Sequence, residues 1–134
     1  MLRGLSTVNF FADDLAAAQA WYTDILGTEA YFVREVQGES AYVEFRIGDY
    51  LHELGIIDGR FAQGSREPGG ALVYWHVDDV QEAFGRLLSK GATAYEEPVE
   101  RGPGFVTASV VDPFGNVLGV MYSQHYLEVL EQPA

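Results

Sequence analysis

Cysteine is absent from this chain of 134 residues, and histidine occurs only three times. The absence of cysteine excludes disulfides, thiolate metal ligands and thiol nucleophiles together. No apolar run approaches the roughly 18–20 residues that a membrane span needs. The first residues also lack the basic stretch followed by an apolar one that is typical of a secretory signal. We therefore expect a cytoplasmic protein.

Basic residues are also few. The chain has eight lysines and arginines and 20 acidic residues, which gives a net charge of −12. Phosphate backbones and anionic membrane surfaces require a basic patch, so we expect neither nucleic acid nor membrane as a partner. The same charge is compatible with a cationic small molecule, and it also serves solubility alone.

The most informative stretch that is present covers residues 110–120. Asp112 and Pro113 favour the start of a tight turn, and Gly115 tolerates the positive φ that such a turn needs. The flanking residues are β-branched or aliphatic. This pattern predicts a hairpin of two buried strands.

The same order of elements occurs twice along the chain. The first half predicts strands over 5–11, 31–34, 40–46 and 50–57, with a helix that begins at Asp13 or Asp14 and ends at Gly27. The second half predicts strands over 72–77, 92–97, 105–111 and 116–122, with a helix that begins at Asp78 or Asp79 and closes at Gly91. Asp-Asp-Leu at 13–15 and Asp-Asp-Val at 78–80 mark the repeat.

These patterns predict one α+β domain over residues 1–134. It contains a βαβββ module at 1–57, a linker at 58–70, a second βαβββ module at 71–122 and a tail at 123–134. A sheet with a helix on one face twists and leaves its other face concave. Two such sheets would pair into a cup-shaped mixed sheet with the helices outside, which suits a small-molecule site.

Several of these motifs resemble the vicinal oxygen chelate superfamily, which includes glyoxalase I, the bleomycin-resistance proteins and the extradiol dioxygenases. The resemblance runs from about residue 5 to about residue 122. It is carried by residues 7–15, Trp21-Tyr22-Thr23-Asp24-Ile25-Leu26-Gly27, Asp78-Asp79-Val80, Gly91-Ala92 and Asp112-Pro113-Phe114-Gly115-Asn116. It implies the paired cup, and it makes a homodimer the expected assembly.

The resemblance also locates the positions that hold a divalent metal in metal-using members. They fall on Thr7, Leu72, Gly119 and Glu53, with His52 beside the last. Only Glu53 carries a usual ligand, and transition-metal sites generally need at least three. We therefore predict no cofactor and disfavour a divalent metal.

Candidate site residues follow from strand alternation. Glu53 and His52 point to opposite faces, and we favour Glu53 as the residue inside the cup. Glu53 and His76 would form a two-ligand site or an acid–base pair, whereas a structural role is the alternative for His76. The other predicted ligand-binding residues are Thr7, Asn9, Phe11, Tyr74, Phe105 and Tyr122.

Three functions are compatible with these residues. The favoured one is a binding protein, similar to the bleomycin-resistance proteins, for a small, partly aromatic molecule that the acidic balance allows to be cationic. The second is a lyase, isomerase or dioxygenase that uses an unusually held metal or the Glu53/His76 pair. The third is a non-catalytic interaction module.

Overall fold

The computed structural model describes residues 1–62, 67–68 and 70–133 of the chain. The chain divides into two compact units, Met1–Arg66 and Glu67–Ala134. The predicted linker at 58–70 spans this division, and its residues 63–66 and 69 lie outside the described residues. The paired, cup-shaped arrangement of the two sheets stays a prediction.

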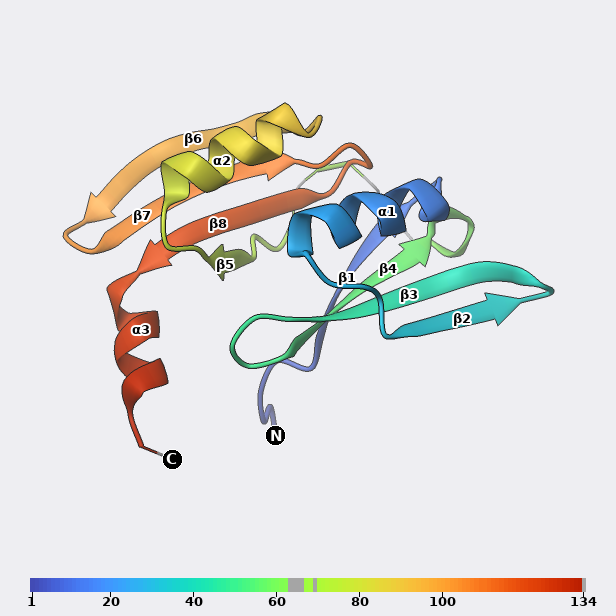
Figure 1. Cartoon of the computed structure of the whole chain (residues 1–134), viewed down its shortest axis with the longest axis horizontal. Coiled ribbons are helices and arrows are strands. Elements are labelled where there is room, and N and C mark those ends of the chain that lie inside the picture. Colours follow the sequence, from blue (N-terminus) through green and yellow to red (C-terminus); the bar gives the residue numbers. More distant parts are fainter. Residues whose placement is uncertain (63–66, 69, 134) are drawn as a thin grey trace. The chain divides into compact units, whose positions relative to one another are not determined.

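The first unit is a four-stranded sheet with one helix on it (Figure 1). The strand order is β1-β4-β3-β2, in which β1 runs parallel to β4 and the other neighbours are antiparallel. Its elements are β1 (Thr7–Ala12), α1 (Leu15–Leu26), β2 (Phe32–Val36), β3 (Glu39–Ile47), β4 (His52–Asp58) and the short 3-10 helix η1 (Gly59–Phe61).

The second unit repeats this plan. Its strand order is β5-β8-β7-β6, again with one parallel pair, β5 and β8 (Figure 1). Its elements are β5 (Tyr74–His76), α2 (Val80–Ser89), β6 (Thr93–Gly102), β7 (Phe105–Val111), β8 (Val117–Ser123) and α3 (Gln124–Glu131). The predicted α+β class and the two βαβββ modules are confirmed.

Side-chain caps decide where the two main helices begin. Asp14 accepts a hydrogen bond from the Ala17 backbone N–H at 3.0 Å, and Asp79 accepts one from Glu82 N–H at 3.0 Å. The second aspartate of each Asp-Asp pair is therefore the cap, because it reaches a backbone donor that the first turn leaves unsatisfied. Gly27 ends α1 in the left-handed conformation.

The turn between β7 and β8 has the predicted form. The buried Asp112 carboxylate accepts hydrogen bonds from the backbone N–H groups of Phe114 and Asn116, at 2.9 and 2.8 Å. Gly115 has a φ of 95°. The carboxylate thus replaces the backbone partners that the turn removes.

The sequence analysis did not predict α3, which lies in the tail. Ser123, predicted as the first tail residue, is instead the last residue of β8, and its hydroxyl accepts a hydrogen bond from Tyr126 N–H at 3.2 Å. Among the described residues, no helix is long and apolar enough to cross a membrane.

Each unit has its own core between its sheet and its helix. Alternate strand residues are buried on the helix side, such as Val43 and Ile56 in the first unit and Val110 in the second. From the helices, Tyr22 of α1 and Phe84 of α2 pack into these cores. We call the opposite side of each sheet, away from α1 or α2, its distal face.

Candidate functional site

Alternation along β3 brings polar side chains to the distal face of the first sheet. Ala41, Val43 and Phe45 are buried on the helix side. Because side chains alternate along a strand, Tyr42, Glu44 and Arg46 belong to the distal face.

The strand register arranges this face in rows. One row runs across four strands as Asn9, Gly55, Glu44 and Phe32. The next row contains Thr7, Glu53 and Arg46. On the other side of the first row lie Phe11, Ile57, Tyr42 and Arg34. Residues far apart in the sequence thus form one polar surface.

Hydrogen bonds and ion pairs connect these rows. The Tyr42 hydroxyl donates to Glu44 Oε1 at 2.5 Å. The Arg46 guanidinium binds Glu53 Oε1 at 3.0 Å, and its central carbon lies 4.8 Å from the centre of the Tyr31 ring. Glu53 is therefore neutralised by a neighbour, whereas Glu44 bonds to a neutral phenol.

A glycine allows the central side chains to converge. A Cβ atom added to Gly55 would lie 2.4 Å from both Asn9 Oδ1 and the Tyr42 hydroxyl oxygen. The amide and the phenol therefore occupy the space above Gly55, beside the Glu44 carboxyl in the same row. Any larger residue at this position would push them apart.

Burial and the neighbouring charges change the acidity of this cluster. Burial raises the pKa of the Glu44 carboxyl above its ordinary value, the Glu53 charge raises it further, and Arg46 lowers it. Burial also raises the pKa of the Tyr42 phenol, which a hydrogen bond with the Thr7 side chain lowers. Glu44 thus holds a proton more tightly than an exposed glutamate does.

Four of the predicted ligand-binding residues lie on this face, namely Thr7, Asn9, Phe11 and Glu53. His52 belongs to the helix side with Leu54 and Ile56. The sequence analysis missed Tyr42, Glu44 and Arg46. Their alternation with Ala41, Val43 and Phe45 was visible in the sequence and is the signal that could have identified them.

The distal face of the second sheet carries the counterpart row, Tyr74, Gly119, Ser109 and Glu96. A Cβ atom on Gly119 would lie 2.7 Å from Tyr74 Cδ1, so the tyrosine ring covers this glycine. Phe105 lies two residues before Thr107 on β7, so its side chain belongs to the same face.

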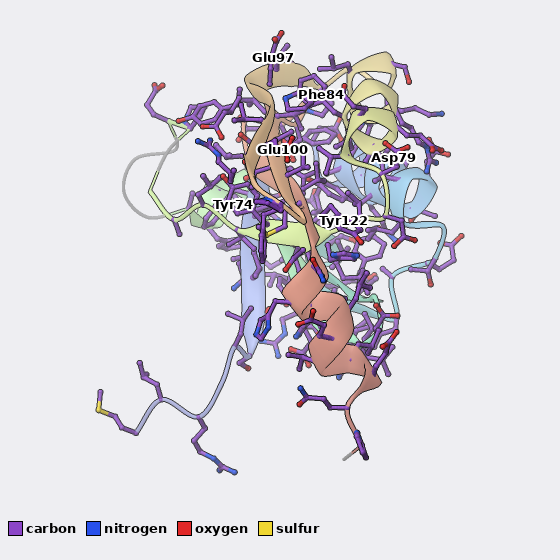
Figure 2. The ribbon with its side chains drawn as sticks, turned by 90° about the vertical axis from the view of Figure 1, so that its left-hand side faces the viewer. Tyr74, Asp79, Phe84, Glu97, Glu100 and Tyr122 are labelled. Carbon is purple, nitrogen blue, oxygen red and sulfur yellow. The ribbon has the colours of Figure 1, made fainter. Side chains whose placement is uncertain are left out.

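Tyr122, another predicted ligand-binding residue, belongs to the opposite face of this sheet, and its ligand-binding role stays a prediction. It pairs with Val106 and alternates with Gly119, which places it on the helix side. Figure 2 shows Tyr74 and Tyr122 on opposite sides of the second sheet, with Tyr122 on the side of Asp79 and Phe84.

His76 has partners inside the second unit. Its Nδ1 accepts a hydrogen bond from Ser123 N–H at 3.2 Å, and its ring stacks on Tyr126 with 4.5 Å between ring centres. These contacts attach α3 to the end of β5. They are consistent with the structural interpretation of His76, and its acid–base role with Glu53 stays a prediction.

The expected metal positions do not fit a metal. In the first unit they supply the Thr7 hydroxyl and the arginine-bound Glu53 carboxylate, and in the second unit Leu72 and Gly119 supply no donor side chain. By register, Gly55 rather than Glu53 is the first-unit counterpart of Gly119. In the part of the chain that the structure describes, no three histidine or acidic residues group as metal ligands do.

The fold belongs to a class of proteins in which a βαβββ unit is duplicated. Each unit forms one four-stranded mixed sheet. The chain is a member of the Glyoxalase/Bleomycin resistance protein/Dioxygenase superfamily, whose family model matches residues 4–120. No curated protein matches the chain.

Solved structures of low sequence identity share this fold. A superfamily member from Sphaerobacter thermophilus has a TM-score of 0.71 and 20% identity, over 90% of this chain and 97% of that one. The fosfomycin resistance protein FosX from Listeria monocytogenes gives 0.68 and 18%, over 90% and 93%. A lactoylglutathione lyase from Agrobacterium tumefaciens gives 0.63 and 21%, over 90% and 94%. Fold alone does not assign an activity.

Proposed function

We propose that this chain binds a small, partly aromatic cation on the distal face of its first sheet, without a metal. The observation that carries this proposal is the Glu44 carboxyl, half-buried at the centre of a row and bonded to a neutral phenol rather than to a cation. An ammonium or amidinium group would supply the missing positive charge and a charge-assisted hydrogen bond.

Aromatic rings next to Glu44 support the second part of the proposal. Phe32 pairs with Glu44 across the strands, and its ring centre lies 6.3 Å from that of Tyr42. Phe32 and Tyr31 are 40% and 49% exposed, so both rings have surface to offer. Rings beside a carboxylate suit a flat cation, because both attract positive charge.

The experiment compares three probes of one size: benzylamine, benzyl alcohol and benzoate. Isothermal titration calorimetry near pH 7 should give the tightest binding for benzylamine. Glu44→Gln should weaken benzylamine binding by about 10- to 100-fold, because a hydrogen bond to a charged group contributes roughly 1.5–3 kcal/mol. Binding should also weaken on acidification at a higher pH than an ordinary glutamate would give, since the Glu44 pKa is raised.

The matched control is Glu131→Gln, which removes the same charge from an exposed residue at the end of α3. It should leave the affinity unchanged. Equal affinities for the three probes, or an equal loss in both variants, would contradict the proposal, because net charge would then explain the binding.

Metal independence has its own test. Dialysis against a chelator should not change the affinity for benzylamine, and elemental analysis should find less than stoichiometric nickel, zinc, iron and manganese. Metal retained in stoichiometric amounts by the wild type and lost in Glu53→Gln would favour the enzyme alternative instead. Homodimer formation stays a prediction, which analytical ultracentrifugation would test.

A further inference from the structure

The attachment of α3 to the second unit depends on a histidine at the end of β5. The His76 side chain is 9% exposed, and its ring plane lies within 6° of the Tyr126 ring plane on α3. The Tyr122 ring centre is 5.5 Å from that of His76. Figure 1 shows α3 projecting from the end of β8, and a helix of eight residues is not stable alone. Contacts such as this stack therefore keep α3 folded.

The hydrogen bond of His76 requires a neutral ring. Its Nδ1 accepts from the Ser123 backbone N–H at 3.2 Å, so the single ring hydrogen of the neutral form is on Nε2. A second proton could enter the ring only at Nδ1, where it would meet the Ser123 N–H, and two donors cannot bond to each other. Ser123 is also the cap of α3, because its hydroxyl accepts from Tyr126 N–H. Proton uptake by His76 therefore acts directly on the residue that starts the helix.

A second attachment of α3 does not titrate. The Gln124 N–H donates to the Gly104 carbonyl oxygen at 3.0 Å, in the turn between β6 and β7. This bond holds the first residue of α3, whereas the His76 ring holds the third, Tyr126. Loss of the His76 contacts would thus free the helix beyond its first residue while the chain stays attached at Gln124.

The groups around the ring allow it to accept a proton. Asp78, in the loop before α2, has its Oδ1 3.5 Å from Nε2, which has no hydrogen-bond partner within the described part of the chain. The phenols of Tyr122 and Tyr126 face the ring from β8 and α3 and carry no charge near neutral pH. Asp78 is 94% exposed, so its attraction for a charged ring is weak but has the favourable sign. A protonated ring therefore has a better partner in Asp78 than in the Ser123 N–H.

We propose that His76 is a pH-sensitive switch for α3, whose neutral ring keeps the helix attached and whose protonated ring releases it. Histidine is the side chain that ordinarily changes charge between about pH 5 and 8. Because attachment requires the neutral ring, it is favoured at high pH and is lost as the pH falls, by at most about tenfold per pH unit for one proton. Release exposes Tyr126 and Leu127, which are half-buried when α3 is attached. The switch lies in the second unit and needs no ligand, so it goes beyond the proposed cation binding.

The first test measures which ring nitrogen carries the hydrogen. Long-range ¹H–¹⁵N NMR of the labelled full chain, near pH 7.5 and without any probe molecule, should show His76 with its hydrogen on Nε2. A hydrogen on Nδ1 at this pH would overturn the proposal, because Nδ1 could not then accept from Ser123.

The second test follows α3 itself. The helical Cα chemical shifts of residues 126–130 should lose at least half of their size between about pH 7.5 and pH 5.5, whereas those of α2 should not change. His76→Gln should abolish this dependence on pH, because an amide oxygen accepts from the Ser123 N–H without titrating. The matched controls are His52→Gln and His125→Gln, which alter the other two histidines of the chain and should keep the transition.

A further variant leaves the histidine in place. Tyr126→Leu removes the stacked ring from α3, so most of the helical shifts should already be absent near pH 7.5, with α2 intact. The proposal is overturned by α3 shifts that do not change with pH in the wild type. It is equally overturned by a transition that persists in His76→Gln, or by a helix that remains at both pH values in Tyr126→Leu.

Discussion

The two units share a backbone plan, but their distal faces differ in chemistry. Tyr42, Glu44 and Arg46 of β3 stand where β7 has Thr107, Ser109 and Val111, at a constant offset of 65 residues. A phenol, a carboxylate and a guanidinium are thus replaced by two hydroxyls and an aliphatic side chain. The helix sides, by contrast, are apolar in both units. The comparison teaches that the core holds the repeated fold while the distal face is free to change its chemistry.

The largest expected difference concerns the two matched glycines. In Gly119→Ala the new Cβ would lie 2.6 Å from the Val73 backbone oxygen, which cannot move without shifting the chain. In Gly55→Ala it meets Asn9 and Tyr42, whose side-chain ends can rotate away. Urea unfolding should show a loss of about 3 kcal/mol for Gly119→Ala and about 1 kcal/mol for Gly55→Ala.

Gly85→Ala is the control for these glycine variants. This glycine lies in α2 with nothing within 4 Å of an added Cβ, so alanine should raise stability by roughly 0.5–1 kcal/mol. Equal losses at positions 55 and 119 would mean that the side chains above Gly55 are held as firmly as the backbone.

The second prediction uses pH to separate Glu44 from Ser109. A carboxyl whose pKa is raised by folding contributes stability below its unfolded pKa, and this contribution is lost as the pH rises through the folded pKa. Ionised Glu44 is therefore a cost near pH 7, and Glu44→Gln should raise the free energy of unfolding there by less than about 1 kcal/mol. The gain should shrink as the pH falls through the raised folded pKa of Glu44, because the wild-type carboxyl then takes up its proton.

The effect of Ser109→Ala on unfolding should not vary with pH over this range, because a serine hydroxyl does not titrate. A Glu44→Gln effect that persists unchanged at low pH would show that packing, and not charge, separates the two rows.

The smallest effect is expected for Arg46→Met, which gives the first sheet an apolar residue as in Val111. The Arg46–Glu53 ion pair is partly exposed, so its loss should cost less than about 1 kcal/mol. Because Arg46 lowers the pKa of Glu44, the variant should raise it. An NMR titration of the Glu44 carboxyl would measure this, with Arg3→Met as the control. An unchanged Glu44 pKa would show that the Arg46 charge does not act on the Glu44 carboxyl.

Much of the fold was predictable because its signals are local. The Asp-Asp pairs, Gly27 and the Asp112 turn specify helix ends and a hairpin through contacts within a few residues. Alternation was also sufficient to place Tyr122 on the face of β8 opposite Gly119.

Other features depended on contacts between distant segments. The helix α3 has only eight residues, too few to be stable alone, and its attachment uses the stacking of Tyr126 on His76. Alternation along β3 shows the face of Glu44, but its row neighbours Asn9 and Gly55 come from other strands, and only strand pairing places the three in one row.

The sequence by itself determined two βαβββ units, their helix caps, their hairpin turn and the faces to which strand residues belong. Those features follow from the local backbone preferences of Asp, Pro and Gly and from the two-residue period of a strand. Tertiary structure alone decided which residues share a row, because register depends on the pairing of distant strands and shifts at an irregularity such as the one between Arg34 and Glu35. The candidate sites depend on this register, because their residues come from different strands.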